Sequence, residues 1–261
     1  MRTKHLFRIW RGIQVVTKEL LGLPRDTLAY QPVSLERMDY DAYWASLSQV
    51  TWLPQRVPII AERIEPGASV LDLGCGDGTL LAYLAETRQA RVSGIDVSNQ
   101  ALELSRQKGL QDLRQADLSA LDFTLEGCYD YIIVTEVLEH IPNPEDLMQK
   151  LSEHFERAIL VSIPNIGFYK HRLRLAFGRF PQQWGKHPGE HLRFWTLTDF
   201  RWWVQRLGYR VLEQVPTNGF PRLFRIMPGL FANQVVFVIG HSGEPAELSG
   251  ASRRADCVNG L

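Results

Sequence analysis

Three glycines at alternate positions follow a short apolar run near residue 70. The run 70–73 leads into Gly74, Gly76 and Gly78, and a helical pattern begins directly after them. Glycines allow positive φ and close approach of a ligand to the backbone, and the free N–H groups at a helix start can bind it. Because Thr79 stands where the dinucleotide fingerprint needs its third glycine, the spacing argues against a nicotinamide-dependent dehydrogenase. The turn predicts a different cofactor site at the carboxyl edge of a parallel sheet.

Acidic residues stand at the ends of the next two predicted strands. Asp96 ends the strand 91–96, 18 residues after Gly78, and Asp117 follows the strand 111–115. A carboxylate at Asp96 can accept hydrogen bonds from both ribose hydroxyls of an adenosine. Asp117 is placed to meet the adenine amino group. The two acids therefore predict a cofactor that contains adenosine.

A second polar group follows the predicted strand 129–134. If the segment after this strand is helical, Glu136, Glu139 and His140 share one face, because positions three and four apart are neighbours on a helix. Such a cluster can transfer protons or hold a divalent metal. His140 is the first candidate for a general base, since its ordinary pKa of about 6.5 suits neutral pH. The alternative is that His140 only caps the turn and shapes a pocket.

Short apolar runs alternate with amphipathic segments along the chain. This pattern is typical of a parallel sheet covered by helices on both faces, and such a sheet would position these residues. We predict an α/β fold with a doubly wound, seven-stranded, mostly parallel sheet whose last strand is antiparallel. The remaining strands are expected at 69–73, 157–163, 209–215 and 235–239, and the helices near 79–87, 99–108, 144–154 and 198–207. The expected organisation is an N-terminal helical extension (1–55), a cofactor-binding domain (56–240) and a disordered tail (241–261).

Between the fifth strand and the last helix lies a connection, 164–195, that is longer than the ~2–6 residues usual in such folds and predicts a lid. Its aromatic residues alternate with basic ones, and Glu190 is its one acid. This composition could enclose an acidic or phosphorylated acceptor, or rest on lipid headgroups. The alternative is a helical cover whose basic face is merely solvated. The basic residues are Lys170, Arg172, Arg174, Arg179, Lys186 and Arg193.

Composition excludes several classes of function. Lys+Arg and Asp+Glu balance at 29 each, so no nucleic-acid partner is expected. The three cysteines form no C-x-x-C pair and no apolar run is long enough to span a membrane, so we expect a cytoplasmic protein. The segment 2–21 predicts a basic amphipathic helix, which could contact an anionic membrane or simply pack on its own domain. The oligomeric state is not predicted.

The segment from Asp72 to Gly78, together with Asp96 and Asp117, resembles in order and spacing the cofactor motifs of class I S-adenosylmethionine-dependent methyltransferases. The resemblance covers roughly 66–240. It implies that Asp72 and the glycines surround the methionine part of S-adenosylmethionine, that Asp96 holds the ribose, and that Asp117 with Leu118 frames the adenine. The cofactor-binding residues that it implies are Asp72, Gly74, Cys75, Gly76, Gly78, Asp96, Val97, Asp117, Leu118 and Thr135.

The spacing E-x-x-E-H from Glu136 to His140 resembles ubiquinone-pathway O-methyltransferases and small-RNA 2′-O-methyltransferases. In the small-RNA 2′-O-methyltransferases, these positions and a further histidine form a magnesium site. His191 corresponds to that histidine here. Many methyltransferases with a Glu-His pair after the fourth strand use no metal, so Mg²⁺ is one alternative and a metal-free site the other. The expected catalytic residues are His140, Glu136, Glu139 and His191.

Three further segments are similar to the branch of the methionine-biosynthesis protein W: 162–168, 191–196 and 230–234. The overall resemblance implies a methyltransferase for a small, anionic or lipid-like acceptor. The alternative, also implied by this branch, is a non-catalytic, cofactor-binding partner of a biosynthetic acyltransferase. The long N-terminal extension and the E-x-x-E-H cluster depart from the branch and argue against that accessory role.

Overall fold

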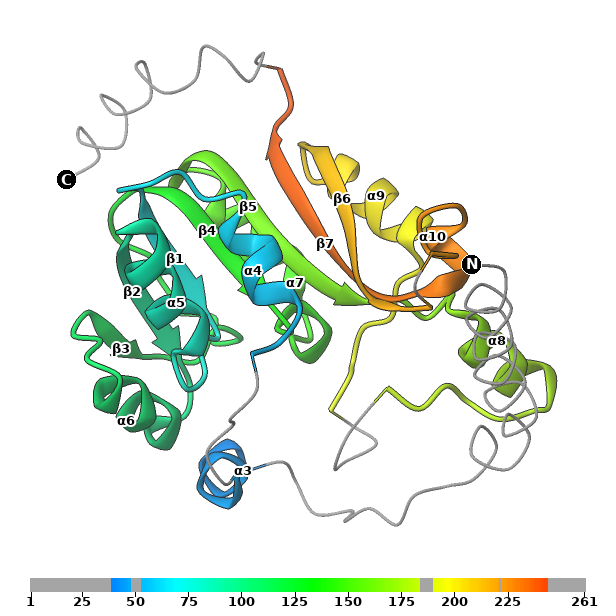
Figure 1. Ribbon diagram of the computed structural model, residues 1–261, viewed down its shortest axis with the longest axis horizontal. Coiled ribbons are helices and arrows are strands. Elements are labelled where there is room, and N and C mark those ends of the chain that lie inside the picture. The colour runs from blue at the N-terminus through cyan, green and yellow to red at the C-terminus, as the bar shows by residue number, and fades with distance from the viewer. Residues whose placement is uncertain (1–38, 48–52, 184–189, 221, 244–261) are drawn as a thin grey trace, which may run out of the picture.

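The computed structural model describes residues 39–47, 53–183, 190–220 and 222–243. A seven-stranded sheet with the order β3-β2-β1-β4-β5-β7-β6 runs through it (Figure 1). β7 is antiparallel to both of its neighbours, and the other pairs are parallel. The predicted mostly parallel sheet with an antiparallel last strand is confirmed. The strands are β1 (Ser69–Leu73), β2 (Arg91–Asp96), β3 (Leu113–Gln115), β4 (Tyr129–Thr135), β5 (Phe155–Pro164), β6 (Tyr209–Gly219) and β7 (Ala232–His241).

Helices cover both faces of the sheet (Figure 1). Apolar side chains of α4 and α5 form one buried cluster with one face, and those of α7 and α9 form a larger cluster with the other. This double burial explains why the central strands are apolar at nearly every position. The helices are α3 (Tyr40–Ser46), α4 (Arg56–Ala61), α5 (Thr79–Arg88), α6 (Asn99–Gln107), the 3₁₀ helix η1 (Leu138–His140), α7 (Pro144–Leu151), α8 (Tyr169–Ala176), α9 (Leu197–Arg206) and α10 (Pro228–Phe231).

The predicted helices and strands are present, with shifts of a few residues at their ends. α7 begins at Pro144, as its proline and early acids indicate, although the Asn143 side chain makes no capping hydrogen bond. Thr196, the residue before α9, caps the helix, because its Oγ1 accepts a hydrogen bond from Asp199 N at 3.2 Å. Inside the predicted lid, α8 occupies 169–176. The predicted helix at 2–21 and nearly all of the predicted tail lie outside the described residues.

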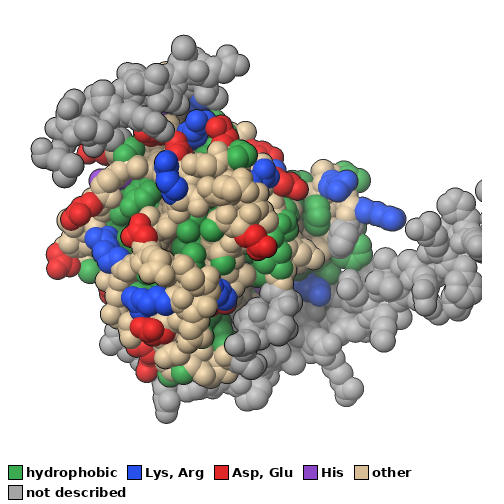
Figure 2. Space-filling model, turned by 60° about the vertical axis from the view of Figure 1, so that its left-hand side comes forward, with side chains coloured by type: hydrophobic (Ala, Val, Ile, Leu, Met, Phe, Trp, Pro, Cys, Tyr) green, Lys and Arg blue, Asp and Glu red, His purple; other side chains and the backbone are tan. Residues whose placement is uncertain are grey.

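The strand order reverses between β1 and β4, which are neighbours in the sheet although β2 and β3 lie between them in the chain. In open α/β sheets, ligands bind at the carboxyl ends of the strands at such a reversal. The glycine turn follows β1 and the Glu-His segment follows β4, so both open at this point. Acidic and basic side chains are intermixed on the face in Figure 2. Among the helices of the described residues, none has the length and apolar content needed to cross a membrane.

Candidate functional site

The turn after β1 has a backbone that glycine permits. Gly74, Gly76 and Gly78 have φ of 74°, 55° and 70°, values that other residues rarely adopt. A Cβ at Gly74 would collide with Val137, and one at Gly76 would lie 2.7 Å from the Trp44 ring. The turn is fixed to β2, because Ile95 O accepts hydrogen bonds from the two N–H groups that follow β1. These contacts form a close-fitting cradle in which backbone can approach a ligand.

Asp96 is buried beside this turn with both carboxylate oxygens in use. Oδ2 accepts a hydrogen bond from Gly76 N at 2.8 Å, and Oδ1 accepts one from Ser98 N at 2.9 Å. Burial raises the pKa of the carboxyl, and these main-chain donors oppose the rise. Each oxygen can accept a further hydrogen bond. The protein therefore fixes the orientation of Asp96 while leaving acceptor capacity for a ligand hydroxyl.

Asp72, near the end of β1, is a buried acid with unused acceptor capacity. Its side chain is 2% exposed, and among the described residues Oδ1 has no hydrogen-bond partner. Burial raises the pKa of this carboxyl to about 8. A cationic or N–H group of a ligand that reached Oδ1 would reverse that effect. This unused acceptor is compatible with the ammonium group of S-adenosylmethionine, which the sequence resemblance places near Asp72.

The other predicted cofactor-binding residues lie at, or shortly after, the ends of β1, β2, β3 and β4. Val97 is 41% exposed directly after β2, and its carbonyl accepts a hydrogen bond from Gln115 Nε2 at 3.0 Å. Asp117 Oδ1 accepts hydrogen bonds from Ser119 N and Oγ, which form a tight turn after β3. Cys75 and Thr135 are buried at the ends of β1 and β4 respectively. Leu118 is half-buried and packs against the larger core.

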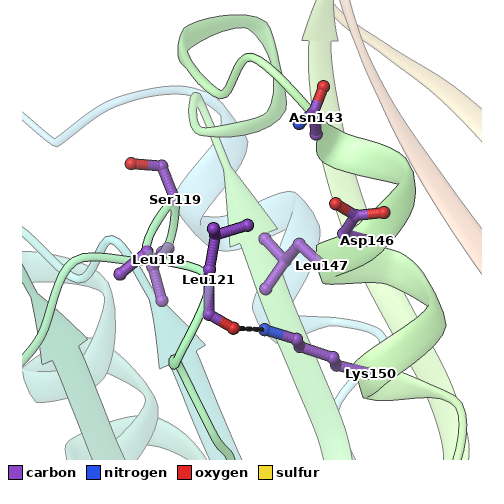
Figure 3. A pocket seen from close by; sticks show the side chains of 8 residues that line it. Leu118, Ser119, Leu121, Asn143, Asp146, Leu147 and Lys150 are labelled. Atoms are coloured by element: carbon purple, nitrogen blue, oxygen red, sulfur yellow. Dashed lines mark hydrogen bonds between the residues drawn. The ribbon is translucent and has the colours of Figure 1, made fainter.

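A small cavity of about 110 Å³ lies between the turn after β3 and α7 (Figure 3). Lys150 Nζ crosses one side of it and donates a hydrogen bond to Leu121 O at 3.2 Å. Drug-sized ligands need roughly 300–1,000 Å³. The predicted acids and histidines do not line this cavity, whereas Leu118, a predicted cofactor-binding residue, does. Its lining residues are Leu118, Ser119, Ala120, Leu121, Asn143, Asp146, Leu147 and Lys150.

The segment after β4 brings Glu139 and His140 together with His191, which is 51 positions further along the chain than His140. One ligand atom from each of the three lies within 4.8 Å of the others. The two imidazole rings meet edge to face, with centroids 4.7 Å apart. Glu139 O accepts hydrogen bonds from Leu192 N and Arg193 N, which fixes the returning chain on η1. The predicted partnership of these three residues is present.

The expectation that Glu136 shares one helical face with this group is wrong. Glu136 has φ 57°, and the 3₁₀ helix begins only at Leu138. Its Oε1 accepts a hydrogen bond from Ser162 Oγ at 2.6 Å, and its N–H donates to the same hydroxyl. The left-handed backbone therefore turns Glu136 toward β5. Glu136 still affects the group, because its charge helps to raise the pKa of Glu139.

Burial favours the uncharged form of each member of the cluster. It raises the pKa of Glu139 well above its usual range, and both of its carboxyl oxygens are without hydrogen-bond partners among the described residues. Burial also lowers the pKa of His140 and that of His191, the latter to about 4. His140 Nδ1 lies 2.6 Å from Glu190 O. Because a carbonyl can only accept, Nδ1 carries the proton and Nε2 is free to accept one.

The short helix α3 contributes site residues that the sequence analysis did not identify. Asp41 Oδ1 accepts hydrogen bonds from Ser98 Oγ at 2.6 Å and Gln100 N at 3.1 Å, which attaches α3 to the start of α6. The Trp44 ring lies over Gly76. Tyr40 is half-buried and its pKa is raised, first by burial and then by nearby carboxylates. Those carboxylates belong to Glu190, Asp96, Glu139 and Asp117. The only available sequence signal was the Tyr-Asp-x-x-Trp spacing.

Curated proteins match the chain over part of their length. The bifunctional methionine biosynthesis protein MetXA/MetW of Rhodopirellula baltica is 29% identical over 209 residues, which are 74% of this chain and 33% of that protein. A ubiquinone biosynthesis O-methyltransferase of Azoarcus sp. is 39% identical over 121 residues, 42% of this chain and 52% of that protein. The chain thus spans about a third to about half of the length of these relatives.

A solved structure and a family model also match this chain. Magnesium protoporphyrin IX methyltransferase from Synechocystis PCC 6803, solved with bound SAH, has a TM-score of 0.55 and 20% identity, covering 77% of this chain and 92% of its own. At that identity the likeness shows the fold. The model of the family described as methionine biosynthesis protein MetW matches residues 55–239. The chain therefore belongs to the MetW family, within the MetW-like branch of the class I S-adenosylmethionine-dependent methyltransferases.

Proposed function

We propose that this chain binds S-adenosylmethionine at the turn after β1 and transfers its methyl group to a small, anionic or lipid-like acceptor. One observation carries the proposal. The buried acids Asp72 and Asp96 and the uncharged pair His140 and His191 open at the same reversal of strand order. Cofactor-binding groups and a proton acceptor thus share one edge of the sheet.

In this proposal Asp72 accepts hydrogen bonds from the ammonium group of the cofactor, and Asp96 accepts them from the ribose hydroxyls. S-adenosylmethionine supplies an electrophilic methyl group. The protein aligns the acceptor with the methyl carbon and sulfur, and such alignment can supply roughly 7–11 kcal/mol of the barrier reduction. When the acceptor is a hydroxyl or amine, His140 Nε2 takes its proton. Tyr40 and Trp44 on α3 close the site over the cofactor.

The test is direct binding followed by methyl transfer. Calorimetry with the full chain should detect binding of S-adenosylmethionine and S-adenosylhomocysteine but not of NADH. Labelled S-adenosylmethionine, incubated with hydroxy acids, phenols and extracted lipids, should then label one acceptor class. Failure to bind the cofactor would contradict the whole proposal. Cofactor binding without any methylated acceptor, together with activation of an acyltransferase by this chain, would support the accessory role instead.

A divalent ion is a second candidate component, because Glu139, His140 and His191 offer three ligand atoms within 4.8 Å. Two imidazoles and one carboxylate suit zinc or another transition metal, whereas Mg²⁺ prefers oxygen ligands. With Glu136 held by Ser162, this donor set does not fit Mg²⁺ well. Calorimetry with ZnCl₂ and with MgCl₂ distinguishes the two ions. If EDTA leaves methyl transfer unchanged, the reaction needs neither.

A further inference from the structure

Two stretches that meet on the acceptor side contain no acidic residue. No Asp or Glu lies between Glu156 and Glu190, nor between Glu213 and Glu244. α8 belongs to the first stretch and α10 to the second, and the two helices are neighbours (Figure 1). The rings of Tyr169 and Phe231, one from each helix, have centroids 5.9 Å apart. The two stretches therefore meet in the fold, and neither contributes a carboxylate where they meet.

Exposed hydrophobic side chains are concentrated on the same two stretches. Phe177 is 67% exposed and Ile226 is 76% exposed, well beyond the isolated partial exposure usual at a protein surface. We call this region the basic apolar face. Its large hydrophobic residues are Leu173, Leu175, Phe177, Phe180, Leu223, Ile226 and Met227.

Basic side chains stand between these hydrophobic ones. Arg172 and Arg179 are exposed at α8 and just after it, and Arg222 and Arg225 are exposed just before α10. Arg172 is also oriented by the fold, because its Nε donates a hydrogen bond to Gly167 O at 2.6 Å. Cations interleaved with exposed Leu, Ile, Met and Phe match the interface of an anionic bilayer, where headgroups lie above apolar chains.

We propose that the basic apolar face docks this protein on an anionic lipid surface. A soluble anion would pair with the arginines but leave the hydrophobic side chains in water. The chain's own segment 2–21 is an unfavourable occupant, because it is basic and its first acid is Glu19. An anionic bilayer satisfies both the charge and the apolar surface.

The face is continuous with the acceptor side of the site. The Phe180 ring lies 5.3 Å from that of Phe194, which in turn lies 6.5 Å from the His191 imidazole, centroid to centroid. Docking would therefore bring the lipid surface close to the proposed base. This part rests on the proposed function, and it favours an acceptor that dissolves in the membrane. The docking itself does not depend on methyl transfer.

Co-sedimentation of the full chain with vesicles tests the docking. Vesicles of phosphatidylcholine with about 30 mol% phosphatidylglycerol should bind the protein, more weakly as salt rises, and pure phosphatidylcholine vesicles should bind little. Arg222→Ser with Arg225→Ser should lower partitioning about 10–30-fold, because each basic residue near an anionic surface contributes roughly a fivefold factor. Phe177→Ser with Ile226→Ser should lower it at all salt concentrations. Leu121→Ser, a 90% exposed site on the cofactor side, is the matched control and should change nothing.

Circular dichroism and thermal melts show whether each variant is folded, so the docking test stands whether or not the chain binds S-adenosylmethionine. Equal recovery in the supernatant with and without vesicles would overturn the proposal. So would vesicle binding that both double variants retain, because the contact would then lie elsewhere, for example in 2–21. Binding abolished by soluble glycerophosphate would indicate an anion pocket instead of a membrane surface, and salt-sensitive binding to RNA without vesicle binding would indicate a nucleic-acid partner.

Discussion

The proposed cofactor half and the proposed acceptor half of the site are built in different ways. In the cofactor half, Asp96 is held by two main-chain N–H groups, and the glycine turn is bonded to β2. In the acceptor half, Glu139 has no side-chain hydrogen-bond partner among the described residues, and His191 Nδ1 has none either. A preformed backbone cradle suits a cofactor that binds in the same way in every catalytic cycle. A buried cluster with unused polar atoms suits an acceptor that must bring its own hydrogen bonds and exchange a proton.

The two halves also differ in how they control charge. Three main-chain hydrogen bonds oppose the rise that burial causes in the pKa of Asp96, whereas for Glu139 the Glu136 charge adds to that rise and the pKa lies well above its usual range. A buried charge is costly, so burial favours the neutral form of the proposed acceptor cluster. Neutral imidazoles are the form in which histidine accepts a proton. If the two halves have separate roles, changes in the proposed cofactor half should alter cofactor affinity, and changes in the proposed acceptor half should alter turnover.

The largest effect is expected in the acceptor half. His140→Ala should lower turnover by roughly 10²–10⁴, the usual contribution of a positioned base, while S-adenosylmethionine affinity stays within a few-fold. Steady-state kinetics on the identified acceptor and calorimetry measure the two quantities. His154→Ala is the control, because the His154 ring bonds Gly127 O in an exposed loop. If His140→Ala reduced affinity and turnover together, the proposed division between the halves would be wrong.

The same residue predicts the pH dependence. Because burial lowers the pKa of His140, the imidazole remains neutral and able to accept a proton to a lower pH than free histidine does. As pH falls, kcat/KM should therefore decline with a midpoint below the ordinary value of about 6.5. Rates measured from pH 5 to 8 in buffers of constant ionic strength check this. A midpoint above about 6.5 would show that His140 does not act as the base.

In the cofactor half, Asp96→Ala should weaken S-adenosylmethionine and S-adenosylhomocysteine by about 1.5–3 kcal/mol, through loss of a charge-assisted hydrogen bond and of the order in the turn. Calorimetry measures both ligands. Asp122→Ala, an exposed acid in the connection between β3 and β4, should leave both affinities unchanged. Unaltered binding by the Asp96 variant would remove the ribose role assigned to this residue.

The cofactor half could be predicted from the sequence because its residues belong to short segments. Gly74, Gly76 and Gly78 follow one strand directly, and Asp96 ends the next, so hydrophobic periodicity and spacing suffice. The sheet follows from the same local signals. The acceptor half depends on backbone conformation that these signals do not contain. The left-handed φ of Glu136 turned its side chain to β5, and a helical turn had been expected there.

The role of α3 was missed for a related reason. Tyr40 and Trp44 lie more than 30 residues before Gly76 and Asp96 and outside the matched family model, so no sequence spacing connects them to the site. Their partners become visible only when α3 packs on α6. His191 was identified solely through the family resemblance. Hydrogen bonds from 192 and 193 to Glu139 O explain how the chain brings it to His140.

Replacing Asp72 is expected to stabilise the cofactor-free fold at high pH while weakening cofactor binding. Its pKa of about 8 in the folded protein lies above that of the unfolded chain, so the folded state binds more protons and stability falls as pH rises from about 4 toward 8. Asp72→Asn should therefore raise the melting temperature relative to wild type at pH 9 and bind S-adenosylmethionine more weakly. Thermal melts of the cofactor-free proteins at pH 5 and pH 9 measure the first effect. A difference between variant and wild type that does not grow with pH would contradict the assigned pKa.

The smallest expected effect concerns α3, which joins the two halves. Trp44 lies over Gly76, and Tyr40 is close to acids of both the cofactor and the acceptor halves. If α3 closes the site, Trp44→Ala should release S-adenosylhomocysteine about threefold to tenfold faster, a change on the order of 1 kcal/mol. Asp41→Ala should act in the same direction, because it removes the hydrogen bonds from Ser98 and Gln100 that attach the helix.

Stopped-flow displacement measures both rates, and Trp202→Ala, which changes an exposed tryptophan on α9, is the control. Closure predicts a change in the dissociation rate with little change in association, since the cradle remains formed when α3 is loosened. Equal dissociation rates in all the variants would mean that the cofactor half holds its ligand without α3, and that the helix serves only to pack on α6.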